Sequence, residues 1–304
     1  MTKVAIMGAG EMGAWFAKQY ASKGLEILMS DNDFQKAQKV AFEVKGRAGD
    51  AREMIPLADE IVIATSLDSI EKVIQDNRGS LRSKKLYDIS SIKNGIPDLL
   101  GEVSDHSFSL HPMWGGATDS FRGQNAILVP TRNLNDAVYE QFFEGFKKRF
   151  IDYGCNVGVL TSEQHDRMMA WEIGLPHYLH VINGGAKSMS GIDRAHGLKF
   201  EGTTARLTHV ATESVVNSDP KFYREIQQRN PYMKDVRRTF LEVSTMLDDD
   251  LSNGKGERFE DMMRAAKEYF MAGEQIETYL PQVKQEFVVA NRGVLNVRNG
   301  SLRN

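Results

Sequence analysis

The chain has 304 residues, a length typical of two domains. Its 38 basic and 41 acidic side chains leave a net charge of −3, too balanced to attract nucleic acid or an anionic membrane. No apolar run reaches the roughly 18 residues of a membrane span, the N-terminus lacks a signal-peptide layout, and the single Cys155 excludes an internal disulfide and a cysteine metal site, so we expect a cytoplasmic protein without a bound metal.

The first half of the sequence alternates between short apolar runs and amphipathic stretches. Runs that predict strands lie at residues 4–7, 25–29, 61–64, 86–89, 108–110 and 126–129. Stretches that predict helices lie between several of them, including residues 67–75 and 134–150. Strands that are apolar on both faces and alternate with helices are typical of a mostly parallel sheet covered on both sides.

After Cys155 the pattern changes. Residues 157–160 predict a last strand, and beyond them the apolar residues repeat at helical spacing. The helical faces run through residues 207–215, 236–247 and 259–270. The sequence therefore predicts an α/β doubly wound domain at residues 1–160 and an all-α domain at residues 161–304, with a loose polar tail from Asn291.

A glycine-rich motif, Gly8-Ala9-Gly10-Glu11-Met12-Gly13, follows the first predicted strand and opens the first predicted helix. Gly8 allows a tight turn, Gly10 lets backbone N–H groups approach a pyrophosphate, and Gly13 lets the helix pack closely on the strand. Asp31 ends the second strand at the expected distance and can accept from ribose hydroxyls. No cation adjoins Asp31 before Lys36, which favours NAD over NADP.

The motif and its acidic partner predict a Rossmann-type, NAD-binding first domain. We expect the cofactor contacts to come from Gly8, Gly10, Glu11, Met12, Gly13 and Asp31. The alternative interpretation is a glycine-rich turn that binds nothing. The strand before the motif, the helix after it and the acidic residue together favour cofactor binding.

Two further segments follow later strands, at the edge where doubly wound folds bind their ligands. The first runs from Asp88 to Lys93, and the second is His111-Pro112-Met113-Trp114-Gly115-Gly116. A histidine at such a strand end, here His111, can take a proton while a hydride leaves for a nicotinamide. Ser91 can orient that histidine or bind the same hydroxyl. The alternative for His111 is a capping or core histidine.

Polar residues also punctuate the predicted helical domain. Residues 161–164, Thr-Ser-Glu-Gln, predict a capping box that opens a helix, and His165 can simply hold that helix start. Pro176 predicts a kink that can aim His177 into a cleft.

Three further polar residues of this domain, Arg206, His209 and Glu213, share one helical face. We expect His209 and Glu213 to form a solvated polar face. Arg206 differs, because a small anionic substrate needs a fixed cation that can bind a carboxylate through two N–H groups.

Together these segments resemble the prephenate dehydrogenase family of tyrosine biosynthesis, most closely its archaeal and single-domain forms. The segments follow the family's order along nearly the whole chain: residues 8–13, 88–93, 111–115, 165–169, 174–177, 206–207 and 218–231. The chain departs from the family in one loop, where Trp114 and Gly115-Gly116 stand in place of a frequent Phe and Gly-Pro.

The resemblance implies an NAD-dependent oxidative decarboxylation of prephenate to 4-hydroxyphenylpyruvate. It implies that His111 takes the proton of the C4 hydroxyl and that Ser91 binds both the same hydroxyl and His111. It places Arg206 at a substrate carboxylate, His177 near the pyruvyl side chain and Lys93 among the substrate-binding residues. With the apolar faces of the helical domain, it also implies a homodimer formed through that domain.

Three alternatives remain open at this stage. The same fold can act on arogenate or another cyclohexadienyl compound, or the chain can be a nucleotide-sensing protein that has lost turnover. A hydroxyacid or imine reductase of two-domain architecture is a more distant alternative. Since the chain starts at a strand and ends in helices, we expect no chorismate mutase domain and no small regulatory domain.

Overall fold

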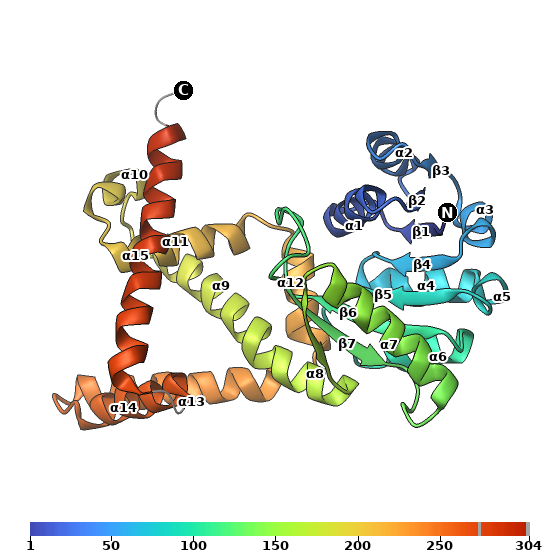
Figure 1. The fold of residues 1–304 in the computed structure, drawn as a ribbon. Helices are drawn as coiled ribbons and strands as arrows, with labels where there is room; N and C mark the ends of the chain where they lie inside the picture. Colours follow the sequence, from blue (N-terminus) through green and yellow to red (C-terminus); the bar gives the residue numbers. More distant parts are fainter. Residues whose placement is uncertain (273–274, 302–304) are drawn as a thin grey trace. The chain divides into compact units, whose positions relative to one another are not determined.

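The computed structural model describes residues 1–272 and 275–301, and the chain divides into two compact units (Figure 1). The sheet unit comprises Met1–Met169 together with Gln228–Pro231, and the helical unit comprises Ala170–Gln227 and the chain from Tyr232 onward. The sheet unit thus extends past residue 160, the boundary expected from the sequence. It includes helix α8 (Ser162–Met169) because side chains of that helix bond to residues at the sheet edge.

Eight strands of the described chain form one sheet in the order β3-β2-β1-β4-β5-β6-β7-β8. All neighbouring strands are parallel except β6 and β7. The strands are β1 (Lys3–Met7), β2 (Glu26–Ser30), β3 (Arg47–Ala48), β4 (Glu60–Ile63), β5 (Lys85–Asp88), β6 (Ser107–Pro112), β7 (Asn125–Pro130) and β8 (Asn156–Val159). Every predicted strand is present. The edge strand β3 was not predicted because its two residues form no apolar run.

Helices cover both faces of the sheet, which confirms the doubly wound fold (Figure 1). One face carries α1 (Glu11–Ser22), α2 (Phe34–Glu43) and α7 (Ala137–Asp152). The other carries α3 (Ala51–Leu57), α4 (Leu67–Asp76), α5 (Arg78–Leu81) and α6 (Ile96–Val103). Helix α7 starts later than the predicted residue 134 because Asp136 caps it, accepting from the N–H groups of Val138 and Tyr139.

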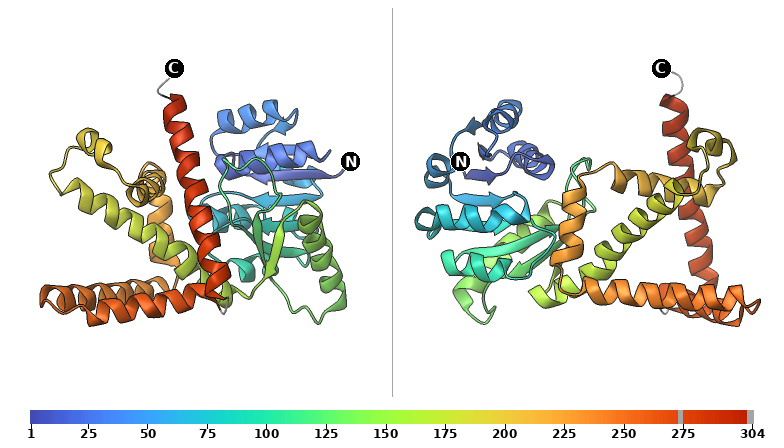
Figure 2. Two further views of the ribbon diagram at one scale, coloured as in Figure 1. Left: turned by 60° about the vertical axis from the view of Figure 1, so that its left-hand side comes forward. Right: turned by 180° about the vertical axis from the view of Figure 1, so that it is seen from behind.

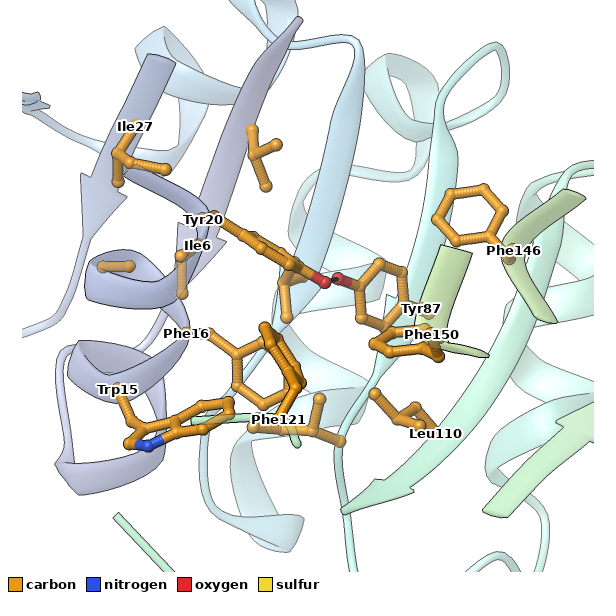
Figure 3. Close-up of a cluster of buried hydrophobic side chains, with 14 of the residues drawn as sticks. Ile6, Trp15, Phe16, Tyr20, Ile27, Tyr87, Leu110, Phe121, Phe146 and Phe150 are labelled. Atoms are coloured by element: carbon orange, nitrogen blue, oxygen red, sulfur yellow. Dashed lines mark hydrogen bonds between the residues drawn. The ribbon is translucent and has the colours of Figure 1, made fainter. Parts of the chain in front are cut away.

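Aromatic side chains fill the layer between the sheet and helices α1 and α7 (Figure 3). Phe121 lies against Trp15 at a ring distance of 4.8 Å and against Phe16 at 6.0 Å. Within this layer the hydroxyls of Tyr20 and Tyr87 hydrogen-bond to each other, and burial raises the pKa of both phenols. The layer anchors helix α1, and with it the glycine loop from which α1 starts.

The helical unit is built from helices that pack in pairs, α9 on α11, α11 on α15 and α13 on α14 (Figures 1 and 2). Its helices are α9 (Leu175–Ser188), α10 (Arg194–Gly197), α11 (Thr203–Val216), α12 (Pro220–Arg229), α13 (Met233–Ser252), α14 (Glu257–Met271) and α15 (Ile276–Ser301). The π-helix η1 (Ala170–Gly174) and the 3-10 helix η2 (Leu198–Phe200) complete them. Pro176, where the sequence predicts a kink, lies in the first turn of α9, directly after this π-helix.

The prediction of a loose tail from Asn291 is wrong as far as Ser301, because the chain continues there in helix α15. Helix α15 packs on α11, and the Asn291 side chain accepts a hydrogen bond from Arg206 at 2.9 Å. The polar composition of this segment reflects a helix with one contacting side rather than a segment without structure.

The helical unit buries little apolar surface by itself. In the part of the chain that the structure describes, neither α9 nor α14 has a buried side chain. Large apolar side chains such as Val181, Phe270 and Val289 are 48%, 67% and 59% exposed. Monomeric proteins seldom leave so much apolar surface open to water.

Candidate active site

The glycine loop after β1 is shaped by close packing at two of its three glycines. Gly8 has φ 108°, a conformation that suits glycine, and a Cβ there would lie 2.5 Å from the carbonyl oxygen of Ala64. A Cβ on Gly13 would lie 1.9 Å from the carbonyl oxygen of Gly8. Both glycines are therefore required by the protein's own packing, as the motif predicts.

Gly10 is different, because a Cβ there would meet no atom within 4 Å. It is the N-cap residue of α1, and no side chain caps the helix. The first N–H groups of an α-helix lack partners inside the helix, and they bind anions well. Gly10 thus leaves open space in front of an uncapped helix start, which fits the pyrophosphate of a dinucleotide.

Asp31 directly follows β2, and its carboxylate is held beside the glycine loop. One oxygen accepts from the N–H of Ala9 at 2.6 Å and the other from the N–H of Asp33 at 2.8 Å. Lys36 pairs with Asp33 at 3.7 Å. Two carboxylates therefore stand where the adenosine ribose of a dinucleotide would bind in this fold, an environment that suits a free 2′-hydroxyl better than a phosphate.

Glu11 and Met12, both predicted cofactor contacts, use their side chains within the protein. Glu11 accepts a hydrogen bond from the backbone N–H of Gly116 at 3.0 Å, and Met12 packs against the core. A Cβ on Gly116 would lie 2.4 Å from Glu11 Cγ, so this glycine makes room for the glutamate. The backbone N–H groups of Glu11 and Met12 lie at the start of α1, where they suit an anionic ligand.

The rest of the loop after β6 is also fastened to α1. The indole N–H of Trp15 donates to the carbonyl of Thr118 at 2.5 Å. The rings of Trp15 and Trp114 lie 5.3 Å apart, and Phe16 lies 6.5 Å from Trp114. The residues in which this loop departs from the family therefore pack on the helix that carries the glycine loop.

His111 lies near the end of β6, buried at 3% exposure, and forms a chain with two residues of α8. Its Nδ1 lies 2.8 Å from Nε2 of His165, and Nδ1 of His165 lies 2.7 Å from a carboxylate oxygen of Asp166. The structure gives His111 Nε2 no hydrogen-bond partner among the described residues. Burial, the neighbouring His165 and Lys93 lower the pKa of His111 well below the usual value, so the ring is a neutral potential base at physiological pH.

The Lys93 side chain is buried near the His111–His165–Asp166 hydrogen bonds and does not reach the surface. This burial does not support the predicted role of the side chain in substrate binding. Its ammonium is fully buried, 3.2 Å from the buried carboxylate of Asp88, and it donates to the carbonyl of Leu110 at 2.9 Å. Its backbone N–H donates to Asp166 at 2.8 Å. Burial lowers the pKa of Lys93, while Asp88 opposes that shift. Lys93 thereby supports both the strand end before His111 and the carboxylate of Asp166.

Ser91 is half-buried, and no hydrogen bond of its hydroxyl occurs in the part of the chain described. It is the neighbouring Ser90 whose hydroxyl bonds to Asp88 and to the carbonyl of Ile92. The predicted hydrogen bond between Ser91 and His111 is therefore absent from the described residues. The Ser91 hydroxyl remains available to a ligand.

Arg206 and His177 belong to the helical unit. The Arg206 guanidinium donates to Asn291 and, at 3.3 Å, to the carbonyl of Glu201. The His177 ring meets Tyr223 edge-on at 4.6 Å, and burial lowers its pKa to about 4. His177 Nδ1 is buried without a partner among the described residues.

The expectation of a solvated face at His209 is wrong. His209 is 9% exposed, and its Nδ1 lies 2.6 Å from the carboxylate of Glu201. Glu213 binds Arg194 at 3.0 Å. The face that the sequence gives as polar is therefore partly an internal network of the helical unit.

Asp88, His165 and Asp166 lie in segments that resemble the family, but from the sequence Asp88 and Asp166 were assigned no individual role and His165 only that of holding a helix start. The capping box before His165 is confirmed, since the Thr161 N–H donates to the Gln164 side chain at 3.0 Å and the Gln164 N–H donates to the Thr161 hydroxyl at 3.2 Å. The signal that could have found the pair is its place in the first turn of a helix that follows the last strand. Such a helix starts at the sheet edge where ligands bind.

Within the residues described, no group of three or more His, Cys, Asp or Glu side chains is arranged to hold a metal ion. None of the described helices is both long enough and apolar enough to cross a membrane.

Two family models match the chain. The model described as "Prephenate dehydrogenase, nucleotide-binding domain" matches residues 14–151, and the model described as "Prephenate dehydrogenase, dimerization domain" matches residues 161–265. The first match falls in the sheet unit. It begins after the glycine loop, which is identified by its own geometry.

A curated relative from Methanocaldococcus jannaschii, named "Probable arogenate/prephenate dehydrogenase", is 26% identical over 271 residues. The match covers 87% of this chain and 60% of that relative, so the chain spans less than two thirds of it. A solved prephenate dehydrogenase from Aquifex aeolicus, in complex with hydroxyphenyl propionate and NAD+, has a TM-score of 0.72 at 17% identity, covering 90% of this chain and 98% of that chain. The arogenate dehydrogenase of Synechocystis has a TM-score of 0.57 at 17% identity, covering 88% of this chain and 100% of that chain. These structures share the fold.

Proposed function

This chain belongs to the prephenate dehydrogenase family, and we propose that it catalyses the NAD-dependent oxidative decarboxylation of prephenate to 4-hydroxyphenylpyruvate. The observation that carries the proposal is the position of His111. It lies at the end of β6, on the edge of the parallel strands where the glycine loop follows β1. A neutral, buried histidine and a dinucleotide loop on one sheet edge suit a reaction in which a proton and a hydride leave the same carbinol.

The glycine loop and Asp31 would hold the cofactor. The N–H groups at the start of α1 would bind the pyrophosphate across Gly10, and Asp31 would accept from the ribose hydroxyls. When bound, NAD supplies the acceptor for the hydride. The relative from Aquifex aeolicus whose structure contains NAD+ supports this choice.

His111 would take the proton of the C4 hydroxyl on its Nε2 atom as hydride leaves C4. The bond between the ring and its carboxylate breaks, carbon dioxide leaves, and the electron pair completes an aromatic ring. The C4 oxygen, now a phenolate, then takes back the proton and becomes the phenol of the product. The free hydroxyl of Ser91 would bind the same C4 oxygen. Because aromaticity drives the step, the protein needs chiefly to position the reactants and accept one proton.

For substrate anchoring we propose Arg206, whose guanidinium can bind a carboxylate through two N–H groups, and His177, whose buried Nδ1 lacks a partner among the described residues. Arogenate is the second candidate substrate, because the Methanocaldococcus jannaschii relative is named for both compounds. The two compounds share the ring chemistry and differ in the side chain.

We further propose that the protein is a homodimer formed through the helical unit. Val181, Phe270 and Val289 are examples of apolar side chains that this unit leaves exposed. A second copy would cover such surface, and the matching family model is described as a dimerization domain.

The test is turnover of purified protein with NAD and either prephenate or arogenate. NADH is followed by its absorbance, and the product is identified as 4-hydroxyphenylpyruvate or tyrosine. We expect one NADH per aromatic product, with the larger kcat/KM for prephenate. A larger value for arogenate reassigns the substrate, and the absence of NADH with both compounds overturns the proposed function.

A further inference from the structure

The hydrogen bonds around His165 determine where the ring protons lie. The carboxylate oxygen of Asp166 that faces His165 also accepts the backbone N–H of Lys93 at 2.8 Å, so this oxygen acts as an acceptor. His165 must therefore carry its hydrogen on Nδ1, which leaves a lone pair on Nε2. That lone pair lies 2.8 Å from Nδ1 of His111, so His111 donates from Nδ1 and keeps an unprotonated Nε2.

We propose that His111 and His165 act as a single base, in which the proton taken at His111 comes to rest on His165 beside Asp166. This inference rests on the proposed function and extends it to α8. The substrate hydroxyl gives its proton to Nε2 of His111, and the hydrogen on Nδ1 of His111 passes to Nε2 of His165. His111 ends neutral with hydrogen on Nε2, and His165 ends as an imidazolium paired with the Asp166 carboxylate.

The charges around the pair favour that end state. The charged groups that face the two rings are Lys93, Asp88 and Asp166. Lys93 and Asp88, both fully buried, form an ion pair with each other at 3.2 Å. Asp166 is then the carboxylate without a cation, and its second oxygen is buried with no hydrogen-bond partner among the residues described. A proton on His165 neutralises this buried charge, which is costly to leave uncompensated.

The same geometry explains why the proton should rest on His165 and not on His111. His165 Nδ1 lies 2.7 Å from the carboxylate, whereas the His111 ring is hydrogen-bonded to His165 and not to a carboxylate. Burial lowers the pKa of His165, and the hydrogen bond to Asp166 opposes that shift; His111 has no such carboxylate partner, and the Lys93 ammonium disfavours a charge on either ring. The two rings therefore share one site for a proton, with its stable position next to Asp166.

Asp166→Asn tests the role of the charge with little change of shape. The N–H of Lys93 requires an acceptor at its position, so the asparagine should place its oxygen there and leave its NH2 group at the unpartnered position. The hydrogen on His165 Nδ1 and the tautomers then persist, while the negative charge is lost. We expect kcat to fall about 10²-fold, within the range for losing general-base assistance, and the acid limb of the pH profile to move to lower pH. Glu163→Gln, an exposed carboxylate on the same helix, is the matched control and should change neither.

A measurement without substrate separates this inference from the proposed function. Nitrogen-15 NMR of the histidine rings at neutral pH should show that both His111 and His165 carry hydrogen on Nδ1 and have an unprotonated Nε2. On acidification His165 should become doubly protonated before His111, and at lower pH in Asp166→Asn. Hydrogen on Nε2 of His111 at neutral pH, or His111 taking the added proton, overturns the inference even if prephenate is turned over.

The kinetics of Asp166→Asn can also contradict the inference. If Asp166→Asn keeps the kcat and the acid limb of the unaltered protein, His111 works alone and the inference is wrong. If the NMR results are as expected but prephenate and arogenate both give no NADH, the shared proton site stands and the proposed function fails.

Discussion

The carboxylate of Asp31 determines which dinucleotide the protein prefers. Its two oxygens are fixed by the N–H groups of Ala9 and Asp33, so it cannot turn away from a bound ribose without losing both bonds. A 2′-phosphate would meet this carboxylate and that of Asp33. We predict a kcat/KM at least about tenfold higher with NAD than with NADP, which corresponds to about 1.4 kcal/mol.

Asp31→Asn should narrow this preference because it removes the like-charge repulsion but keeps a polar side chain at the same place. The kinetic comparison of the two cofactors, made on both proteins, checks the prediction. A preference for NADP in the unaltered protein contradicts the role given to Asp31.

Substitution of Arg206 tests whether its guanidinium binds a carboxylate of the substrate. Arg206→Ala should raise the KM for prephenate strongly, with a loss of about 2–5 kcal/mol in transition-state binding, while the affinity for NAD stays the same. Asn291→Ala is the matched control, since it breaks the same hydrogen bond to α15 but leaves the cation in place. Equal effects of the two substitutions on KM would mean that Arg206 serves only to hold helix α15.

Among the individual residues of the site, His111 and the glycine loop could be identified from the sequence, but the residues that support them could not. His111 could be found because it follows a strand directly. The burial of Lys93 was not predicted, because a lysine just past a strand end is usually exposed. Its partner Asp88 lies five residues earlier, but the carbonyl of Leu110 and the carboxylate of Asp166 come from other segments of the chain. Burial created by such long-range contacts has no local signature in the sequence.

The glycine loop is the element whose sequence can be tested position by position. Gly10→Ala places a methyl group in open space at an ordinary backbone conformation, φ −68° and ψ −174°. We predict an unfolding free energy within about 0.5 kcal/mol of the unaltered protein, together with weaker NAD binding. Gly13→Ala should instead cost about 1–3 kcal/mol or more of stability, because its Cβ would lie 1.9 Å from the Gly8 oxygen.

Thermal unfolding and NAD titration of both variants check this pair of predictions. If Gly10→Ala binds NAD normally, the open space at Gly10 is not where the pyrophosphate lies. If Gly13→Ala is as stable as the unaltered protein, the helix can shift away from the loop more easily than the packing indicates.

The loop after β6 shows what element-level patterns could and could not reveal. Its departure from the family at Trp114 was visible in the sequence, but the reason was not. In the structure the Trp114 ring packs against the Trp15 ring. The absence of a side chain at Gly116 leaves room for the side chain of Glu11. The unusual residues are thus matched to helix α1, and they fix the position of the segment that follows His111.

Strands and helices could be predicted wherever the apolar repeat in the sequence was long. Prediction failed where contacts with other segments determine the secondary structure. The two-residue strand β3 has too few residues for a repeat. The segment from Asn291 lacks a continuous apolar stripe, yet it forms helix α15 because it packs on α11. Both cases are tertiary contacts that override a weak local pattern.

For the whole molecule, the exposed apolar side chains of the helical unit predict the assembly. We predict a mass in solution of twice the 34.2 kDa chain by sedimentation or light scattering. Val289→Glu, on the exposed side of α15, should weaken the dimer because a carboxylate would be buried at the interface. Phe42→Glu, at an apolar and even more exposed position in the sheet unit, is the control. A monomer at micromolar concentration for the unaltered protein contradicts the assembly.

The central claim is that His111 is the base for oxidation of a cyclohexadienol, and one substitution tests it most directly. Asn at position 111 keeps a hydrogen-bonding side chain but has no basic nitrogen. Single-turnover and steady-state rates of His111→Asn with prephenate and NAD should fall about 10²–10⁴-fold, while NAD affinity and thermal stability stay unchanged. Because the pKa of His111 is lowered, the unaltered protein should keep its kcat as the pH falls through 6.5 and lose it only below that value. A His111→Asn protein with near-normal kcat and the same pH profile would contradict the account, since His111 would then be a structural residue and the base would lie elsewhere.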